Sequence, residues 1–233
     1  MLETRIQSFN DARAKDYLSL MKEGLERIRA MVGELLAFAR PTAETANVSI
    51  RDTFQSAFRL AEKTFLENRV DWELDIPDGL PTLVGKRNEF GQIALNLIIN
   101  AAQATQGLPS PKVIVSARVE SAAVPAPGLR ADSGDGRRET TDANRTMDVA
   151  RQRLVIRVKD NGCGIPESIQ DSIFDIFFTT RETQGGSGIG LAMTRHLVAS
   201  MGGHIAVESA VGQGATFILS FPLPDAEQRP VAN

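Results

Sequence analysis

The order of apolar and polar residues in this chain predicts helices in some segments and strands in others. Over the first 40 residues, apolar positions recur at alternating intervals of three and four, which predicts one long helix over residues 12–40, ended by Pro41. The same spacing fits two structures equally well: the seam of a coiled coil or helical bundle, and an amphipathic helix lying on the core of its own domain. The apolar positions are Leu18, Met21, Leu25, Ile28, Val32 and Leu35.

The segments after Pro41 predict a mixture of helices and short strands. Segments 112–119 and 153–159 alternate apolar and polar residues and predict two paired strands. Their connection, residues 121–152, is rich in proline, glycine and charge, which predicts a disordered insertion. Further strands are predicted at residues 47–49, 70–74, 82–84, 204–209 and 215–221. A helix is predicted over residues 50–67, with an apolar side formed by Phe54, Phe58, Leu60, Ala61 and Phe65.

A helix predicted over Glu89–Gln103, with Asn88 as its expected N-cap, carries four amide side chains on one face. Asparagine is a poor residue inside a helix, and a buried amide without a partner costs about 1–3 kcal/mol. The stripe therefore requires partners, and a nucleotide with its metal ion would supply them. The four amides, spaced by four, four and three residues, are Gln92, Asn96, Asn100 and Gln103.

Two glycine clusters follow the predicted strand at residues 153–159 and flank an aromatic run. The first cluster, residues 160–166, places Asp160 where that strand ends, and its carboxylate can accept a hydrogen bond from the exocyclic amine of an adenine. The second cluster, residues 186–190, opens directly into a helix, whose free N–H groups attract phosphate. Either cluster alone is more often a turn than a binding site. The amide helix upstream of both favours the binding site.

Composition excludes several classes of protein. A formal net charge of -3 over 233 residues gives no basic surface for nucleic acid or for an anionic membrane. No apolar run approaches the roughly 20 residues of a membrane span. A single cysteine excludes a disulfide framework, so we expect a cytoplasmic location, either for a separate protein or for the cytoplasmic part of a membrane protein. That cysteine, Cys163, lies between two glycines, and we interpret it as a spacer.

These stretches together resemble the histidine-kinase catalytic domain, within the wider ATPase group that includes gyrase, the ninety-kilodalton heat-shock chaperone and MutL. The amide helix resembles the asparagine box, the glycine clusters resemble the first and second glycine boxes, and the aromatic run resembles the phenylalanine box. The match extends from about residue 48 to residue 224. The resemblance implies an α+β fold, a two-layer α/β sandwich with a mixed, mostly antiparallel sheet packed on helices, preceded by a long N-terminal helix.

By this resemblance the chain binds ATP and Mg²⁺. Asn100 is the expected magnesium ligand, and it is expected to act in catalysis with Asn96, one turn earlier toward the phosphates. Asp160 would receive the adenine amine, and Thr216 would lie beneath the adenine. The aromatic run would begin a mobile lid, in which Arg181 stands where the family often has a lysine. The expected ATP-binding residues are Asn96, Asn100, Gln103, Asp160, Gly162, Gly164, Ile165, Phe178, Thr179, Thr180, Arg181, Gly186, Ser187, Gly188, Ile189, Gly190, Leu191 and Thr216.

The resemblance also divides the chain into parts. Residues 1–41 correspond to a partial dimerisation and phosphoacceptor hairpin, mainly its second helix, residues 42–224 to the ATP-binding catalytic domain, and residues 225–233 to a loose tail. The chain's two histidines, His196 and His204, both follow the second glycine cluster. We therefore expect the phosphoaccepting histidine on a hairpin upstream in cis or in trans, and only a weak homodimer.

Three functions remain open from the sequence. The favoured one is the catalytic portion of a two-component sensor histidine kinase, which phosphorylates a histidine for relay to the receiver domain of a response regulator. Asn96 stands where hydrolytic relatives carry a glutamate that activates water, which favours transfer over hydrolysis. The alternatives are an ATP-driven conformational clamp of the gyrase or chaperone type, and a non-catalytic ATP-binding dimerisation module. A serine kinase acting on anti-sigma partners is a variant that the hairpin-like helix disfavours.

Overall fold

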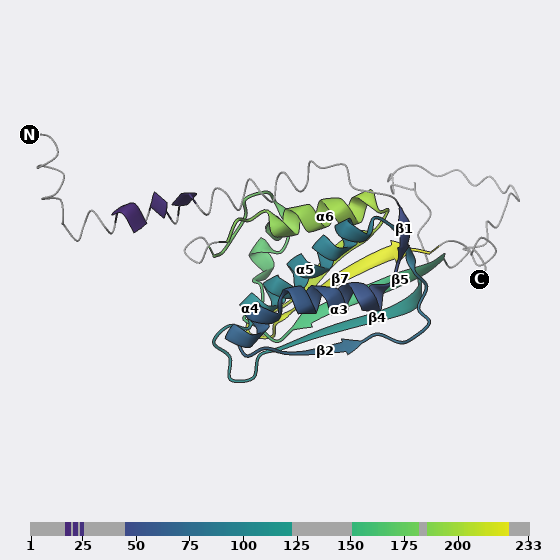
Figure 1. Ribbon diagram of the computed structural model, residues 1–233, viewed down its shortest axis with the longest axis horizontal. Coiled ribbons are helices and arrows are strands. Elements are labelled where there is room, and N and C mark those ends of the chain that lie inside the picture. Colours follow the sequence, from purple (N-terminus) through teal and green to yellow (C-terminus); the bar gives the residue numbers. More distant parts are fainter. Residues whose placement is uncertain are drawn as a thin grey trace, which may run out of the picture.

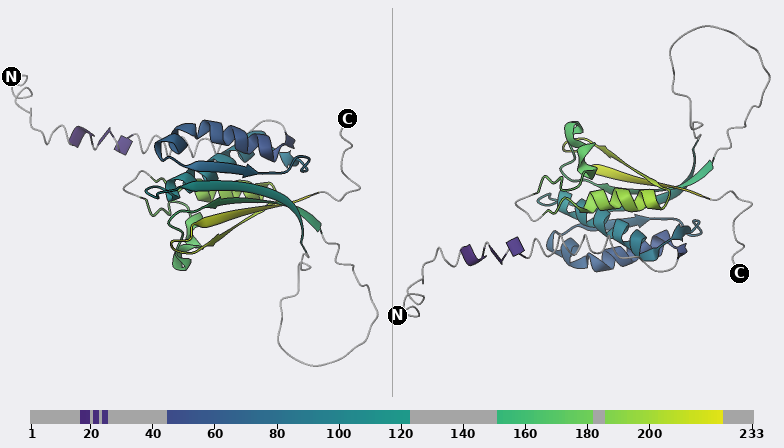
Figure 2. Two further views of the ribbon diagram at one scale, coloured as in Figure 1. Left: turned by 90° about the horizontal axis from the view of Figure 1, so that it is seen from below. Right: turned by 90° about the horizontal axis from the view of Figure 1, so that it is seen from above.

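A five-stranded sheet and the helices on one of its faces form two layers (Figure 1). The computed structural model describes residues 17–19, 21–22, 24–25, 45–122, 151–181 and 186–223. The three longest described helices, α3 (Ile50–Leu60), α5 (Arg87–Ala104) and α6 (Gly190–Ser200), lie on the same side of the strands in both further views (Figure 2). The two-layer α+β fold expected from the sequence is confirmed.

The sheet is mixed and mostly antiparallel, with the strand order β2-β4-β5-β7-β6. Only the β2–β4 pair is parallel, while the other three pairs within the sheet are antiparallel. A separate antiparallel pair, β1 with β3, leads into α5. The strand bounds are β1 Ala46–Val48, β2 Asp71–Asp75, β3 Leu83–Gly85, β4 Lys112–Ala122, β5 Arg151–Asp160, β6 His204–Ser209 and β7 Ala215–Pro222.

The pairing of β4 with β5 extends further than the sequence predicted. Ser121 pairs with Gln152 and Ala122 with Arg151, and the backbone N–H of Leu223 donates to the carbonyl of Gln152 at 3.0 Å. These cross-strand partners continue the ladder into the segment that was expected to be a disordered insertion. The prediction for residues 121–152 is therefore wrong at both ends, and residues 123–150 lie outside the described residues.

The single helix predicted over residues 50–67 is two helices. Helix α3 starts at the N-cap Ser49, whose Oγ accepts from the backbone N–H of Asp52 at 3.3 Å. It ends at Ala61, whose backbone leaves the helical region at φ -91 and ψ 3, and α4 (Glu62–Glu67) follows. Leu60, expected on the apolar side, is 76% exposed because it falls outside the spacing of the buried residues. Those buried residues are Phe54, Ala57, Phe58, Ala61 and Phe65.

The amide-bearing helix α5 begins earlier than expected. Lys86 occupies the N-cap with an extended backbone, φ -88 and ψ 113, so the prediction of Asn88 as N-cap is wrong. Lys86 Nζ lies 2.9 Å from Glu89 Oε1, a pair that fixes the first turn in place of a side-chain cap. The register of the amides along the helix is unaffected, because helical spacing depends on the interior of the helix and not on its first residue.

The core lies between the helices and the inner face of the sheet. Alternate residues of the interior strands β5 and β7 point to the core, including Leu154, Ile156 and Leu219, each 0% exposed. Helix α5 crosses this face with its apolar side, and the ring of Phe90 contacts Phe54 and Phe221 edge to face at centroid distances of 6.4 and 5.8 Å. The polar face of α5 is thereby turned away from the core.

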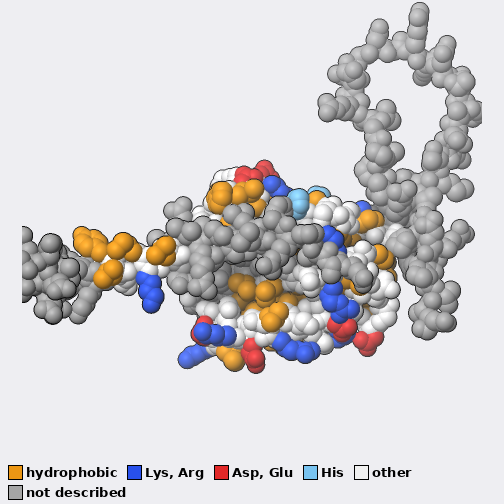
Figure 3. Space-filling view, turned by 45° about the horizontal axis from the view of Figure 1, so that its top comes forward, with side chains coloured by type: hydrophobic (Ala, Val, Ile, Leu, Met, Phe, Trp, Pro, Cys, Tyr) orange, Lys and Arg blue, Asp and Glu red, His pale blue; other side chains and the backbone are white. Residues whose placement is uncertain are grey.

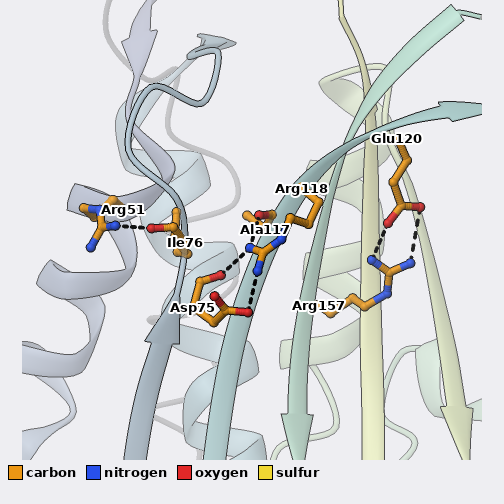
Figure 4. Close-up of polar contacts among 7 residues, drawn as sticks. All are labelled: Arg51, Asp75, Ile76, Ala117, Arg118, Glu120 and Arg157. Carbon is orange, nitrogen blue, oxygen red and sulfur yellow. Dashed lines mark hydrogen bonds and ion pairs between the residues drawn. The ribbon is translucent and has the colours of Figure 1, made fainter.

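The outer face of the sheet carries paired charges (Figure 4). Arg118 bridges Asp75 at 2.6 Å, and Arg157 bridges Glu120 at 2.6 Å, each pair joining neighbouring strands. The hydrogen bond from Arg157 holds the pKa of Glu120 below its ordinary value. Figure 4 also shows Arg51 donating to the carbonyl of Ile76, which ties α3 to the end of β2. The sheet pairs are partly exposed, so each contributes at most about 1 kcal/mol.

The described N-terminal residues are helical and present apolar side chains to solvent (Figure 3). Tyr17, Leu18, Met21 and Leu25 are between 57% and 66% exposed. The remainder of the helix predicted over residues 12–40, the hairpin expected at residues 1–41 and the tail expected at residues 225–233 lie outside the described residues. Within the described part of the chain, no helix is long and apolar enough to cross a membrane.

Candidate functional site

A cavity of about 530 Å³ opens between the polar face of α5, the N-terminus of α6 and the loop that follows β5. Most of the residues expected to bind a ligand line it, although they come from segments up to about a hundred residues apart in the sequence. They are Asn96, Asn100, Gln103, Asp160, Gly164, Ile165, Phe178, Thr179, Thr180, Arg181, Gly186, Ser187, Gly188, Gly190 and Leu191. Gly162, Ile189 and Thr216 do not line the cavity.

Thr216 was expected beneath the adenine, but its side chain does not line the cavity. Successive residues of a strand point to opposite faces, and in β7 the residues that face the cavity are Ala215 and Phe217. Thr216 pairs with Lys159 and Glu208 and belongs to the outer face of the sheet. The pattern of apolar residues at positions 215, 217, 219 and 221 was the sequence signal for this register.

Asp160 lies at the end of β5, 2% exposed, and forms one end of the cavity. Its Oδ1 accepts from the backbone N–H of Gly162 at 2.8 Å and from that of Ala215 at 3.2 Å. Burial raises the pKa of Asp160, while these two N–H groups and the charge of Arg181 act in the opposite direction. No described residue hydrogen-bonds to Oδ2, so this oxygen can accept from a ligand in the cavity.

The glycines of the first cluster allow backbone to approach where side chains would not fit. A Cβ on Gly162 would lie 2.5 Å from the carbonyl oxygen of Ala104, and the neighbouring N–H of Cys163 donates to that oxygen at 3.1 Å. This hydrogen bond ties the loop to the C-terminal end of α5. Gly162 therefore allows the loop to pack against α5, and it does not itself line the cavity.

Gly164→Ala is expected to destabilise the protein far more than Gly212→Ala, because only the first change creates a clash. Both glycines have positive φ, +72 and +76, which an alanine adopts at a cost of about 1 kcal/mol. An added Cβ at Gly164 would lie 2.0 Å from the carbonyl oxygen of Ala210, whereas nothing lies within 4 Å at Gly212. We expect a loss of about 3 kcal/mol or more for Gly164→Ala. Thermal unfolding would measure both, and equal losses would contradict the tight turn at Gly164.

The other end of the cavity is the N-terminus of α6. The N-cap, Ile189, makes no side-chain cap hydrogen bond, so the N–H groups of the first turn have no partner within the helix. The side chain of Ile189 is instead buried in the core, while the next two residues, Gly190 and Leu191, line the cavity. Such a helix end carries partial positive charge and suits phosphate oxygens.

Helix α5 joins the two ends of the cavity. The side chain of Asn96 contacts Gly190 at the start of α6, and Ala104 contacts the loop beside Asp160. Eight residues of helix separate these two contacts, about 12 Å at 1.5 Å per residue. Adenine, ribose and phosphates of one nucleotide fill such a length. Asn100 lies midway between the two.

Three of the four amide side chains on α5 hydrogen-bond to other described residues, and the fourth, Asn100, does not. Gln92 donates to Asn96 at 3.1 Å, and Gln103 accepts from Arg181 at 2.7 Å. The amide of Asn100 has no hydrogen-bond partner among the described residues, although the side chain lines the cavity. Magnesium needs only one or two protein oxygens when phosphates and water complete its shell, so the Asn100 carbonyl fits this ion. Groups of three or more His, Cys, Asp or Glu that could hold a metal do not occur in the described ranges.

Arg181 lies near the adenine-binding end expected around Asp160. Burial lowers the pKa of Arg181, and the neighbouring Cys163 and Asp160 act against that shift. Its guanidinium nevertheless hydrogen-bonds to Gln103, one turn after Asn100 along α5. The lid expected to begin here continues into residues 182–185, which lie outside the described residues.

Several cavity residues carried no local sequence signal. Most are apolar and line the walls, where the sequence pattern alone does not separate a cavity wall from the core. Cys163, interpreted as a spacer, is an exposed free cysteine that also lines the cavity. The residues not foreseen are Ile99, Ala104, Cys163, Pro166, Ile169, Ile173, Ala215 and Phe217.

A buried carboxylate and an uncapped helix N-terminus, at opposite ends of one cavity on an α+β scaffold, define a nucleotide-binding domain. The chain belongs to the histidine kinase-, DNA gyrase B- and HSP90-like ATPase family, whose sequence model matches residues 85–225. The family expected from the asparagine and glycine boxes is therefore confirmed, and with it the ATP-binding domain.

Similar proteins include sensor kinases. The chain is 29% identical over 218 residues to the signal transduction histidine-protein kinase AtoS of Escherichia coli, which covers 93% of this chain and 30% of AtoS. It is 31% identical over 218 residues to the sensor histidine kinase AruS of Pseudomonas aeruginosa, covering 88% of this chain and 19% of AruS. The chain thus spans less than a third of either relative.

Solved structures share the fold. Full-length ShkA in complex with AMPPNP superposes with a TM-score of 0.61 at 24% identity, over 91% of this chain and 39% of ShkA. The histidine kinase ThkA in complex with the response regulator protein TrrA gives a TM-score of 0.62 at 20% identity, over 98% of this chain and 57% of that chain. At these identities the likeness establishes the architecture.

Proposed function

We propose that this chain is the ATP-binding catalytic part of a two-component sensor histidine kinase and transfers the γ-phosphoryl group of magnesium ATP to a histidine. One observation carries the proposal: Asp160, Asn100 and the N-terminus of α6 line the same cavity in the order that adenine, metal-bound phosphate and terminal phosphate require. The relatives named as histidine kinases support it. Because the chain spans only part of them, the activity of the whole protein belongs to the proposal.

Phosphoryl transfer asks the protein mainly to position the phosphates and to neutralise their charge. In this chain, Asp160 would hold the adenine through its free carboxylate oxygen, and the uncapped N–H groups of α6 would hold the phosphate oxygens. Mg²⁺, bound by the Asn100 carbonyl, would neutralise charge on the phosphates. Asn96 lines the cavity where hydrolytic relatives carry a glutamate that activates water, which favours transfer to an acceptor over hydrolysis.

The partners and location follow from the same proposal. ThkA binds a response regulator protein, and we propose a receiver domain as the next acceptor for the phosphoryl group of this protein too. The first acceptor would be a histidine on a dimerisation hairpin, supplied in cis or in trans. A cytoplasmic location and weak self-association complete the proposal.

The chain is expected to bind ATP and to label a separate histidine-bearing hairpin, while acquiring no acid-labile phosphate on its own described histidines. His196 and His204 are exposed residues of α6 and β6, and neither lines the cavity. Incubation with radiolabelled ATP, with and without the added hairpin, measures both transfers. A hairpin whose histidine is replaced by glutamine is the control.

Two outcomes would count against this function. Rapid ATP hydrolysis without any acceptor would favour the conformational clamp over the kinase. Label on His196 or His204, located by mass spectrometry, would show that the acceptor is within the described domain.

A further inference from the structure

The side chain of Asn96 lines the cavity, yet its amide is already engaged inside the protein. Its Oδ1 accepts from Gln92 Nε2 at 3.1 Å. Its Nδ2 donates to the carbonyl oxygen of Gly190 at 3.2 Å and lies 3.5 Å from Thr194 Oγ1. These contacts fix which end of the amide faces α6, because the oxygen is directed to one donor and the NH₂ group to two acceptors.

The contact falls on the first residue of α6. The carbonyl oxygen of Gly190 accepts from Asn96 and also from Thr194 Oγ1, at 2.9 Å. Thr194 is 0% exposed and does not line the cavity, and a methyl group added at Gly190 would lie 3.8 Å from Asn96 Cγ. Asn96 of α5 therefore holds the start of α6 through the Gly190 carbonyl and the Thr194 hydroxyl, while the bond from Thr194 to Gly190 lies within α6 and orients that hydroxyl.

We infer that Asn96, Gln92 and Thr194 are positioning residues, which set the N-terminus of α6 at the distance from Asn100 that bound phosphates require. The inference rests on the proposed function, because the placement of α6 matters only if its N–H groups bind phosphate. A hydrogen bond weakens steeply when its distance or angle departs from the preferred range, so a small shift of the helix end lowers phosphate affinity. Asn96 acts through α6 in this inference, and a direct contact of Asn96 with the nucleotide, which its place on the cavity wall also allows, is the alternative outcome of the test.

A positioning role differs from general support of the fold in one measurable respect. The base end of the cavity is built by β5, β7 and the C-terminal part of α5, none of which contacts Gln92 or Thr194 through the hydrogen bonds described above. Loss of a positioning contact therefore weakens binding of the phosphates and leaves binding of the base unchanged. Loss of general support weakens both.

Calorimetric titration with magnesium AMPPNP and, separately, with adenosine tests the inference on the full chain. We expect Thr194→Val to weaken AMPPNP binding about three- to tenfold, the factor that one ordinary hydrogen bond represents, while adenosine affinity stays within about twofold. Gln92→Leu is expected to act in the same direction, and Gln92 is half-buried, so this variant keeps the test valid if Thr194→Val fails to fold. Thr105→Val is the matched control, since Thr105 is another fully buried threonine whose hydroxyl donates to a helix carbonyl, away from α6.

A double-mutant comparison separates positioning from direct contact. If Asn96 acts through the same hydrogen bonds as Thr194, the variant with both Asn96→Ala and Thr194→Val should bind AMPPNP no more weakly than Asn96→Ala alone. The inference is overturned if Asn96→Ala weakens AMPPNP while Thr194→Val and Gln92→Leu change nothing, or if the variants weaken AMPPNP and adenosine equally. A wild-type chain that binds neither ligand would overturn the proposed function, and the inference with it.

Discussion

Asp160→Asn is expected to lower the affinity for ATP about 100-fold, the equivalent of one or two hydrogen bonds to a charged group. In the wild type, Oδ1 accepts from the N–H groups of Gly162 and Ala215, and Oδ2 is left for the adenine amine. An asparagine has only one oxygen for these two directions. Whichever way its amide turns, an NH₂ group faces another donor. Calorimetric titration with ATP measures the loss, and Asp171→Asn, an exposed carboxylate outside the cavity lining, is the control.

The same substitution is expected to leave the fold at least as stable as the wild type at neutral pH. Burial raises the pKa of Asp160, so its contribution to the free energy of unfolding is favourable below its unfolded pKa and is lost as the pH rises through its folded pKa. The neutral asparagine lacks this loss. The difference in free energy of unfolding between the Asp160→Asn variant and the wild type should therefore shrink as the pH falls through the folded pKa of Asp160. Thermal unfolding at neutral and acidic pH would measure this difference. A variant that loses both stability and ATP binding at neutral pH would contradict the assignment of Asp160 to the ligand.

Asn100→Ala is expected to remove the magnesium-dependent part of ATP affinity, a loss of about tenfold or more, while binding in the presence of a chelator stays unchanged. The Asn100 amide has no protein partner among the described residues, so its removal leaves no donor or acceptor unsatisfied in the fold. Alanine is also the better helix residue, by roughly 0.5 kcal/mol, so the variant should unfold at an equal or higher temperature. Titration with ATP in magnesium and in chelator separates the two contributions.

Asn88→Ala is the matched control for this experiment, because Asn88 lies in the first turn of the same helix, exposed and outside the cavity lining. It should leave both titrations as in the wild type. An Asn100→Ala variant that binds ATP equally well with and without magnesium, at wild-type affinity, would remove Asn100 from the metal site.

The sequence predicted local periodic features better than contacts between distant segments. The spacing of the amides on α5 placed Asn96, Asn100 and Gln103 on the cavity correctly, because helical period fixes a face whatever the residue at the helix start. The break at Ala61 was missed, because the apolar spacing continues across it while the backbone turns. Thr216 was placed on the wrong face, although the alternation in β7 indicated Ala215.

The contacts that complete the site were beyond any local pattern. Asn96 and Gly190 are 94 residues apart, and their hydrogen bond depends on how α5 and α6 pack. The apolar residues of the cavity wall, such as Ile99 and Ile173, read in the sequence as ordinary core residues. Packing of the whole sheet and its helices decides which of them face an opening.

Strand β2 has a consequence for how this domain behaves at high concentration. It lies at the edge of the sheet, and its Asp71, Glu73 and Asp75 alternate along the outer face. Lys112 and Arg118 of the neighbouring strand β4 pair with Glu73 and Asp75 on the same face, at 2.9 and 2.6 Å. A second copy that docked its own β2 along this edge would bring a second row of carboxylates against this one, while Lys112 and Arg118 of each copy are already paired with carboxylates of their own chain. Pairing of two copies through their β2 edges is therefore electrostatically unfavourable, which disfavours aggregation along this edge of the sheet.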